Sequence, residues 1–421
     1  MIEAARIEAI IEVLKTYSQD LTPLDAHLSF YFKARRYIGS KDRQAIASRV
    51  YGIFRHYAHL SWWALLRGVS LNSISAQASA RLQVLAYLIE IEKMERAKIG
   101  ILFNGEKYSP NKLNDQERQL LSVTIANSTP PLWVRGEFPE WLQPQLEAVF
   151  GSDLLPHMQA FQEEAPVDIR TNTLKINRDT LQGQLKLEKI KADPLPESPV
   201  ALRLSERQPL TATKAFRDGL FEVQDLGSQK IAEFLDVMPG QSILDLCAGA
   251  GGKTLSIAAQ MENKGKLVAM DTAGWRLQKA RLRLKRAGVN NTECRVLDED
   301  GLSWLKRQKG RFDRVLIDAP CSGTGTWRRN PEQKWKLAQT EIDRLHEIQL
   351  GLLHQAAPLL KPGGKLVYAT CSVLKVENED VIAKFLNKNE KFSLEKQERL
   401  TPLHNHTDGF FMVTLSIRDA K

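Results

Sequence analysis

The sequence of 421 residues has few cysteines, and their spacing matches neither the common zinc motifs nor a disulfide framework. The four are Cys247, Cys294, Cys321 and Cys371, and none of them belongs to a Cys-x-x-Cys pair. Such spacing disfavours a zinc site, and a reducing compartment disfavours disulfides. We therefore expect no bound metal and expect any functional cysteine to be a free thiol.

Long apolar runs and a secretion signal are also missing. No stretch reaches the about 18 apolar residues that are typical of a membrane span. The first residues, MIEAARIEAIIEVLK, include acids and lack the basic-then-apolar order of a signal peptide. These absences predict a cytoplasmic protein that does not bind a membrane.

The composition favours a soluble multidomain protein with an anionic partner. Hydrophobic residues make up 43% of the chain, enough for a substantial core, and a chain of this length usually forms about two or three domains. The formal net charge is +9. Such a positive balance favours nucleic acid as the partner, although the charge alone is weak evidence.

The first 126 residues predict helices. In RQAIASRVYGIFRHYAHLSWWALL the apolar residues recur at three- and four-residue steps, which places them on one helical face. The basic residues among the aromatics suit RNA binding, but a helix bundle with a solvated basic face fits these residues equally well. The apolar positions are Ile46, Val50, Ile53, Phe54 and Tyr57.

The pattern changes at a proline-rich stretch, ANSTPPLWVRGEFPEW, which predicts a domain boundary. The region 127–218 combines a helix expected near 141–150, a short strand in VDIRTNTLK and a helix or turn after NRDT, and so predicts a small α+β module. From 219 to 421 strands, glycine turns and helices alternate, as in QSILDLCAGAGGKTLSIAAQ. This rhythm predicts a doubly wound parallel sheet.

A glycine-rich turn, DLCAGAGGKT from Asp245 to Thr254, follows the first strand of this sheet. Its glycines allow the backbone to approach a ligand at a helix N-terminus, although a tight structural loop is the alternative. A P-loop is excluded because Cys247 stands where its first glycine is required. A dinucleotide site is disfavoured because the pattern Gly-x-Gly-x-x-Gly is absent.

Acids follow the next two strands. Asp271 ends the second strand, where a carboxylate can accept hydrogen bonds from both ribose hydroxyls of a nucleoside, or can instead cap the following helix. After the third strand, Asp298 or Asp300 is expected to reach an adenine amino group. Glycine turn, ribose acid and third-strand acid together favour S-adenosylmethionine as the cofactor.

Two Cys-Ser pairs end the fourth and fifth strands, in LIDAPCSG and LVYATCS. Ligands of such sheets bind beyond the carboxyl ends of the strands, so Cys321 and Cys371 converge on one pocket if the strands are neighbours. A single buried cysteine is usually a small core residue. Two thiols at equivalent strand ends, one of them close to Asp318, favour chemistry instead.

The segment after the first of these pairs, TWRRNPEQKW, interleaves arginines with tryptophans. Arginines pair with phosphates and a tryptophan stacks on an unpaired base, so the segment predicts contacts with RNA. A packed loop with solvated arginines is the alternative.

The motifs DAPCSGTG, YATCSVLKVENED and DLCAGAGGKT resemble the signatures of RNA cytosine-C5 methyltransferases. Nearly the whole chain is similar to the bacterial members that methylate 16S ribosomal RNA, with SKDRQAIASRVYGIFRH resembling their NusB-like domain and IRTNTLK their linker module. One departure is the turn, which is Ala-Gly-Ala-Gly-Gly here and usually Ala-Ala-Pro-Gly-Gly in the family. The last two glycines and Lys253 are kept.

The resemblance implies an all-α NusB-like helical RNA-binding domain over 1–126, a linker and small α+β RNA-binding module over 127–218, and a Rossmann-like S-adenosylmethionine-dependent α/β methyltransferase domain over 219–421. The implied partner is 16S ribosomal RNA, with no obligate protein partner. Transfer RNA as the target, a non-catalytic RNA-binding assembly factor and a DNA cytosine methyltransferase are the alternatives. The last of these normally has its nucleophile at the Pro-Cys site and needs no second thiol.

The resemblance also implies residue roles. Cys371 is the nucleophile that adds to cytosine C6, Cys321 assists elimination, and Asp318 contacts the base near N3; the residues themselves do not rank the two thiols. The implied cofactor-binding residues are Cys247, Ala248, Gly249, Ala250, Gly251, Gly252, Lys253, Asp271, Asp300 and Asp318.

Overall fold

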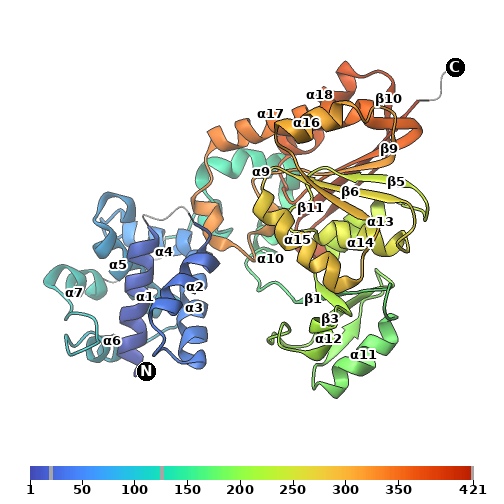
Figure 1. Cartoon of the computed structure of the whole chain (residues 1–421). Coiled ribbons are helices and arrows are strands. Elements are labelled where there is room, and N and C mark those ends of the chain that lie inside the picture. The colour runs from blue at the N-terminus through green and yellow to red at the C-terminus, as the bar shows by residue number, and fades with distance from the viewer. Residues whose placement is uncertain (19–21, 124–127, 419–421) are drawn as a thin grey trace. The chain divides into compact units, whose positions relative to one another are not determined.

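The computed structural model describes residues 1–18, 22–123 and 128–418 (Figure 1). Within it the chain forms two compact units. The helical unit consists of Met1–Glu163 and Trp327–Lys336, and the α/β unit of Glu164–Thr326 and Leu337–Lys421. The predicted boundary between residues 126 and 127 lies outside the described residues. In the described ranges no helix has the length and apolar character needed to cross a bilayer.

Apolar side chains at helical spacing build the core of the helical unit. Ile46, Val50 and Ile53 are buried on α3, as predicted, but the predicted face is interrupted because α3 ends at Arg55 and Tyr57 begins α4. The helices are α1 (Glu3–Tyr17), α2 (Leu24–Ala34), α3 (Ser40–Arg55), α4 (Tyr57–Leu65), α5 (Ala76–Glu90), α6 (Arg96–Leu102), α7 (Asp115–Ser122), α8 (Leu132–Arg135), α9 (Gln143–Phe150) and α10 (Leu154–Ala160).

The segment Trp327–Lys336 follows the first Cys-Ser pair in sequence but packs in the helical unit. Its Trp335 indole N–H donates to the Phe54 carbonyl at 2.8 Å, and the ammonium of Lys334 donates to the Glu137 carbonyl at 3.0 Å. Trp327 and Arg328 are only 1% and 4% exposed. For these two residues the predicted RNA contact is wrong, because packing already uses their surface.

A small antiparallel sheet begins the α/β unit, in the strand order β2-β3-β1-β4. The strand predicted in VDIRTNTLK is present as β1, and the segment after NRDT is a helix, α11. Leu181 and Leu185 on α11 pack against Ile169 and Leu202 of the sheet. The elements are β1 (Asp168–Thr171), α11 (Arg178–Leu187), β2 (Ala192–Pro194), β3 (Ala201–Leu204), α12 (Lys214–Arg217) and β4 (Phe221–Val223).

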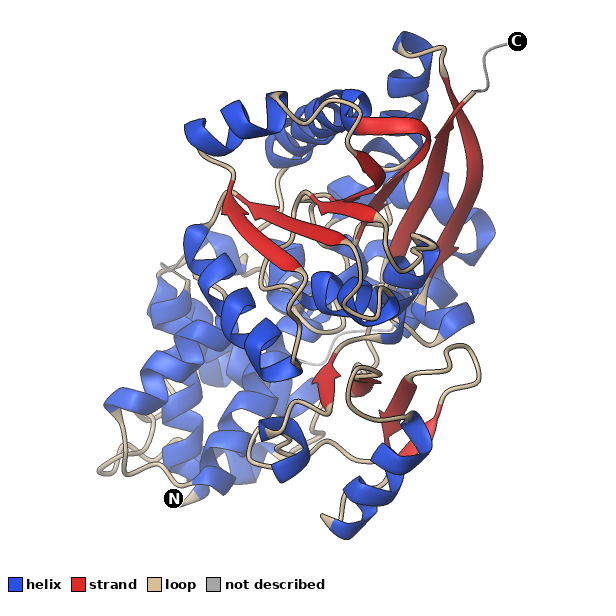
Figure 2. Cartoon of the chain, turned by 45° about the vertical axis from the view of Figure 1, so that its right-hand side comes forward, coloured by secondary structure: helices blue, strands red, loops and turns tan. Residues whose placement is uncertain are grey.

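The large sheet has the strand order β10-β11-β9-β8-β5-β6-β7; Figure 2 shows the strands of both sheets in red. The strands from β9 to β7 in this order are parallel, and β10 and β11 add antiparallel pairs. The strands are β5 (Ser242–Asp245), β6 (Lys266–Asp271), β7 (Thr292–Val296), β8 (Phe312–Asp318), β9 (Leu360–Thr370), β10 (Phe392–Leu400) and β11 (Phe410–Ile417).

Helices cover both faces of the large sheet (Figure 1), which confirms the predicted Rossmann-like architecture. Leu244 packs in the cluster that includes Leu353 of α17, whereas its neighbour Ile243 packs in the cluster with Ile257 of α14. Strands buried on both faces need apolar residues at successive positions, as in these sequences. The helices are α13 (Leu226–Phe234), α14 (Gly252–Gln260), α15 (Gly274–Ala287), α16 (Glu299–Lys306), α17 (Gln339–Ala356), α18 (Glu379–Lys388) and α19 (Pro402–Asn405).

We predict that Gly219→Ala destabilises the α/β unit. Gly219 precedes β4 with φ +69°, and an added Cβ would lie 2.2 Å from the Arg286 carbonyl oxygen on α15. A left-handed alanine costs about 1–2 kcal/mol and a core overlap about 1–3 kcal/mol, so urea denaturation should show a loss of at least about 2 kcal/mol.

The matched control is Gly183→Ala in α11, where an added Cβ meets nothing within 4 Å. A helical alanine should raise the free energy of unfolding by about 0.5–1 kcal/mol. Equal effects of the two substitutions would contradict the steric argument.

Candidate active site

A cavity of about 710 Å³ lies in the α/β unit, where the large sheet meets the turns that follow its strands. Residues from the turn after β5, from the end of β6 and from the end of β8 line it. Gly251 and Asp300, which were also predicted to bind cofactor, do not line it. The predicted residues that do are Cys247, Ala248, Gly249, Ala250, Gly252, Lys253, Asp271 and Asp318.

The glycine-rich turn joins β5 to α14 by two left-handed residues. Gly249 has φ +55° and Gly251 φ +81°, a conformation that glycine adopts without strain. A Cβ on Gly251 would also lie 3.0 Å from that of Ala280 on α15, so the turn and this helix are close-packed. Gly251 therefore shapes the turn from behind instead of facing the cavity.

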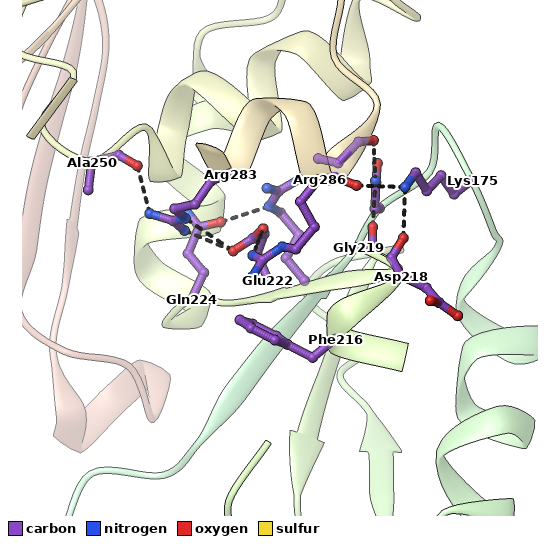
Figure 3. A network of polar contacts seen from close by, with 12 residues as sticks. Lys175, Phe216, Asp218, Gly219, Glu222, Gln224, Ala250, Arg283 and Arg286 are labelled. Atoms are coloured by element: carbon purple, nitrogen blue, oxygen red, sulfur yellow. Dashed lines mark hydrogen bonds and ion pairs between the residues drawn. The ribbon is translucent and has the colours of Figure 1, made fainter. Parts of the chain in front are cut away.

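Arginines of α15 connect this turn to the small sheet, as Figure 3 shows. Arg283 donates to the Ala250 carbonyl at 2.8 Å and to the Glu222 carboxylate of β4 at 3.0 Å. Arg286 donates to the second oxygen of Glu222. Glu222 is only 3% exposed, so the glycine-rich turn and β4 are joined through a buried carboxylate.

Gln224 makes a second connection, between the small sheet and the cavity. It follows β4 and lines the cavity. Its side-chain oxygen accepts a hydrogen bond from Arg170 of β1 at 2.7 Å. Complete burial lowers the pKa of Arg170 to about 10, while the Glu222 carboxylate opposes this shift. Among the cavity residues that were not predicted from the sequence are Gln224, Arg276, Arg283 and Arg344. Two of them, Arg276 and Arg283, lie on α15, whose basic and acid-free sequence GWRLQKARLRLKRA is a signal that could have indicated them.

The acids after β6 and β7 differ in what they face. Asp271 accepts hydrogen bonds from the Gly249 and Ala273 N–H groups, both at 2.8 Å, and also lines the cavity. Asp298 instead caps α16 by accepting from the Gly301 N–H at 2.9 Å. Asp300 is exposed in the first turn of α16, and Leu297 occupies the cavity wall at this point.

Lys253, Asp245 and Asp318 lie close together in the wall of the cavity. Lys253 donates to Asp318 at 2.6 Å; burial lowers the pKa of Lys253, but the Asp318 charge outweighs this effect and raises it. Asp245 is fully buried and accepts from the Thr254 hydroxyl at 2.7 Å. Burial, together with the Asp318 and Asp271 charges, raises the pKa of Asp245 to about 7.

The two Cys-Ser pairs lie side by side because β8 and β9 are parallel neighbours. The Sγ atoms of Cys321 and Cys371 are 3.3 Å apart. The hydrogen bond with Cys371, together with burial, raises the pKa of Cys321 well above its ordinary value. The Cys371 charge contributes to the raised pKa of Lys253, so the ammonium and a Cys371 thiolate attract each other.

The arrangement suits a cationic nucleoside and a reactive base. Asp271 and Asp318 offer carboxylate oxygens to a positively charged group among the basic side chains of the same lining, and Oδ1 of Asp245 is buried without a hydrogen-bond partner in the described structure. The glycine-rich turn offers backbone groups, and Leu297, Ile348 and Leu352 offer apolar surface for a base. These residues fit S-adenosylmethionine, whose sulfonium and amino groups are cationic.

The chain is similar to several known proteins. The family model described as 16S rRNA methyltransferase RsmB/F matches residues 232–416, and the Methyltr_RsmF/B-like, ferredoxin-like domain matches residues 138–211. The chain is 31% identical to the ribosomal RNA small subunit methyltransferase B of Photorhabdus laumondii, over 92% of this chain and 93% of that protein. It is 30% identical to the protein of the same name from Salmonella paratyphi B, over 98% and 97%. The crystal structure of PH0851 superposes with a TM-score of 0.83 at 26% identity, covering 99% of both chains.

We predict that Asp245 makes stability fall as the pH rises. The unfolded chain ionises this carboxyl near its ordinary value of 3.8, whereas the folded chain keeps it protonated up to about 7. Between these values unfolding releases a proton, so the free energy of unfolding should fall by up to about 1.4 kcal/mol per pH unit. Urea denaturation of wild type and Asp245→Asn across this range should show the difference between them shrinking as the pH rises.

Asp313→Asn is the control. Burial raises the pKa of Asp313, but hydrogen bonds from Lys361 and the Ser242 N–H outweigh it and lower the pKa. The ionised Asp313 therefore makes its full contribution to the free energy of unfolding at a pH above the pKa of the unfolded chain. This contribution is lost only as the pH falls below that pKa. The difference in free energy of unfolding between wild type and Asp313→Asn should therefore not change with pH over the range used for Asp245→Asn. A difference for Asp245→Asn that is also independent of pH would contradict the prediction.

Proposed function

Because the chain belongs to the RsmB/F-type methyltransferases of small-subunit ribosomal RNA, which use S-adenosylmethionine, we propose that it methylates C5 of a cytosine in 16S rRNA. The observation that carries this proposal is the pair of thiols 3.3 Å apart after β8 and β9. Neither thiol lines the cavity, but Pro320, which directly precedes Cys321, and Asp318 do. C5 of cytosine is a poor nucleophile until a group adds at C6, and a thiolate adds and leaves again readily.

In this proposal the cavity holds the cofactor. Asp271 accepts from the ribose hydroxyls while it keeps the Gly249 N–H in place, because a carboxylate has about four acceptor sites. The glycine-rich turn, Cys247 to Lys253, surrounds the rest of the molecule, and Asp300 would need to turn inward to contribute. When bound, S-adenosylmethionine supplies an electrophilic methyl group.

Cys371 is the proposed nucleophile. Its thiolate adds to cytosine C6, which forms a C–S bond and moves electron density to C5 and into the ring. Asp318, which accepts from the Lys253 ammonium at 2.6 Å, contacts the base near N3. A proton shared between this carboxyl group and N3, together with the ammonium charge, balances the negative charge in the ring. C5 then takes the methyl group.

Cys321 is proposed to assist the second half of the reaction. A water molecule accepts the C5 proton, the electrons of the C5–H bond re-form the C5–C6 double bond, and the C6–S bond breaks to release Cys371. The raised pKa of Cys321 keeps a proton on this sulfur, from which it can donate to the departing Cys371 sulfur. One thiol thus attacks and the other stabilises its release.

The helical region 1–126 and the module 127–218 are proposed to hold the rRNA, and the region 219–421 to perform the transfer. The matched ferredoxin-like model covers most of the middle region, and the matched methyltransferase model lies within the last. The net charge of +9 supports phosphate binding by such a chain.

The two thiols should be separable by mutation. With Cys371→Ala nothing activates C5, so bisulfite sequencing of 16S rRNA from cells that carry only this variant should show complete loss of one methylated cytosine. With Cys321→Ala addition and methyl transfer should still occur but release should stall. A protein–RNA adduct that survives a denaturing gel should then accumulate.

Cys294→Ala serves as the control, because Cys294 lies on β7 away from both Cys-Ser pairs. It should methylate normally and form no stable adduct. An adduct with Cys371→Ala and none with Cys321→Ala would exchange the two roles. Unchanged 16S methylation in cells with Cys371→Ala would refute the proposed function.

The cofactor assignment has its own test. Asp271→Ala should weaken S-adenosylmethionine binding by about tenfold or more in calorimetry, since hydrogen bonds to a charged group contribute roughly 1.5–3 kcal/mol each. Asp298→Ala, which removes a helix cap and no cavity residue, should leave the affinity unchanged. Equal losses for both variants would assign Asp271 a purely structural role.

A further inference from the structure

One buried carboxylate lies between the two cysteine loops and takes no part in the chemistry above. Glu377 ends a short 3-10 helix, Lys375–Glu377, between β9 and α18. Its side chain is 0% exposed, and it does not line the cavity. A charge in such a position is costly unless hydrogen bonds satisfy it.

Four hydrogen bonds from three parts of the α/β unit satisfy this carboxylate. Ser322 donates its N–H to Oε1 at 2.8 Å and its hydroxyl to Oε2 at 2.5 Å. The Ser372 hydroxyl donates to Oε2 at 2.5 Å, and the Gln349 side-chain amide on α17 donates to Oε1 at 3.1 Å. All four donors are neutral groups, two from Ser322 and one each from Ser372 and Gln349.

The two serines are the residues that directly follow the thiols: Ser322 follows Cys321, and Ser372 follows Cys371. Gln349 also donates to the Pro320 carbonyl at 2.9 Å, so the backbone is held on both sides of Cys321. The carboxylate therefore fixes the chain from which each Sγ atom projects.

We infer that Glu377 is a positioning residue that sets the separation of the two Sγ atoms. The inference rests on the proposed function, in which both thiols act on one base, but the positioning itself requires no RNA. A carboxylate suits the role because two oxygens accept all four donors at once, whereas a glutamine amide accepts on one side only. In Glu377→Gln one loop must shift or leave a donor unpaired.

The test measures the thiol separation directly with dibromobimane, a bifunctional reagent that becomes fluorescent when it bridges two close thiols. The full-length wild type should be cross-linked rapidly between Cys321 and Cys371, as located by peptide mass analysis. Glu377→Gln should be cross-linked roughly tenfold more slowly, because a small displacement lowers the effective concentration of one thiol at the other. Its turnover at saturating RNA should fall about tenfold to a hundredfold.

Affinity for S-adenosylmethionine and KM for RNA should change less than about twofold, since Glu377 lies outside the cavity. The matched control is Glu379→Gln, two residues on, whose carboxylate accepts from Arg399 at 2.6 Å and contacts neither Cys-Ser pair. It should cross-link and turn over like the wild type.

Ser322→Ala provides a second variant if Glu377→Gln folds poorly, because it removes one donor and leaves the carboxylate held by three. It should slow cross-linking by a smaller factor. Wild-type cross-linking in both variants, or an equal slowing in Glu379→Gln, would overturn the inference. A wild type that cross-links but fails to methylate rRNA would refute the proposed function and leave the positioning role standing, since the separation is read without RNA.

Discussion

The parallel pairing of β8 with β5 and β9 is the constraint on which the whole site depends. In this register Asp245 pairs with Leu316 and Asp318 with Ala369, so all three strands end at the same edge of the sheet. Side chains that are far apart in sequence then meet without a dedicated loop. The burial of both sheet faces fixes this register, because a shift of one residue would turn every apolar side chain to the opposite face.

This dependence explains why much of the α/β unit was predictable from sequence. Strand, glycine turn and helix follow one another within a few residues, and their signals are local. The meeting of Cys321 and Cys371 then required only that two successive strands be neighbours. The position of Asp300 was not predictable in this way, because the start of α16 at Glu299 decides which acid caps the helix and which faces outward.

The segment Trp327–Lys336 shows where composition misleads. Tryptophans and arginines serve RNA binding and protein packing equally well, and the sequence cannot show that another part of the same chain buries them. Glu377 escaped notice for a related reason: a single acid in a charged stretch usually points to solvent. Only the structure shows it buried at 0% exposure with four neutral donors around it.

The surroundings of the two thiols are visible only in the structure. Sequence motifs make Cys321 and Cys371 look equivalent, whereas their surroundings differ. The hydrogen bond with Cys371, together with burial, raises the pKa of Cys321, and the Cys371 charge contributes to the raised pKa of Lys253. Because Lys253 also holds Asp318, one cation connects the proposed nucleophile with the group proposed to contact the base.

The same logic extends to the small sheet. Glu222 of β4 is paired with two arginines of α15, one of which holds the Ala250 carbonyl of the glycine-rich turn (Figure 3). Moving the small sheet away from the large one would break the ion pairs of Glu222 with both arginines. The small sheet and the turn proposed to hold the methyl donor are therefore expected to keep one fixed geometry. Substrate placement then depends on where the RNA docks on this unit and not on movement within it.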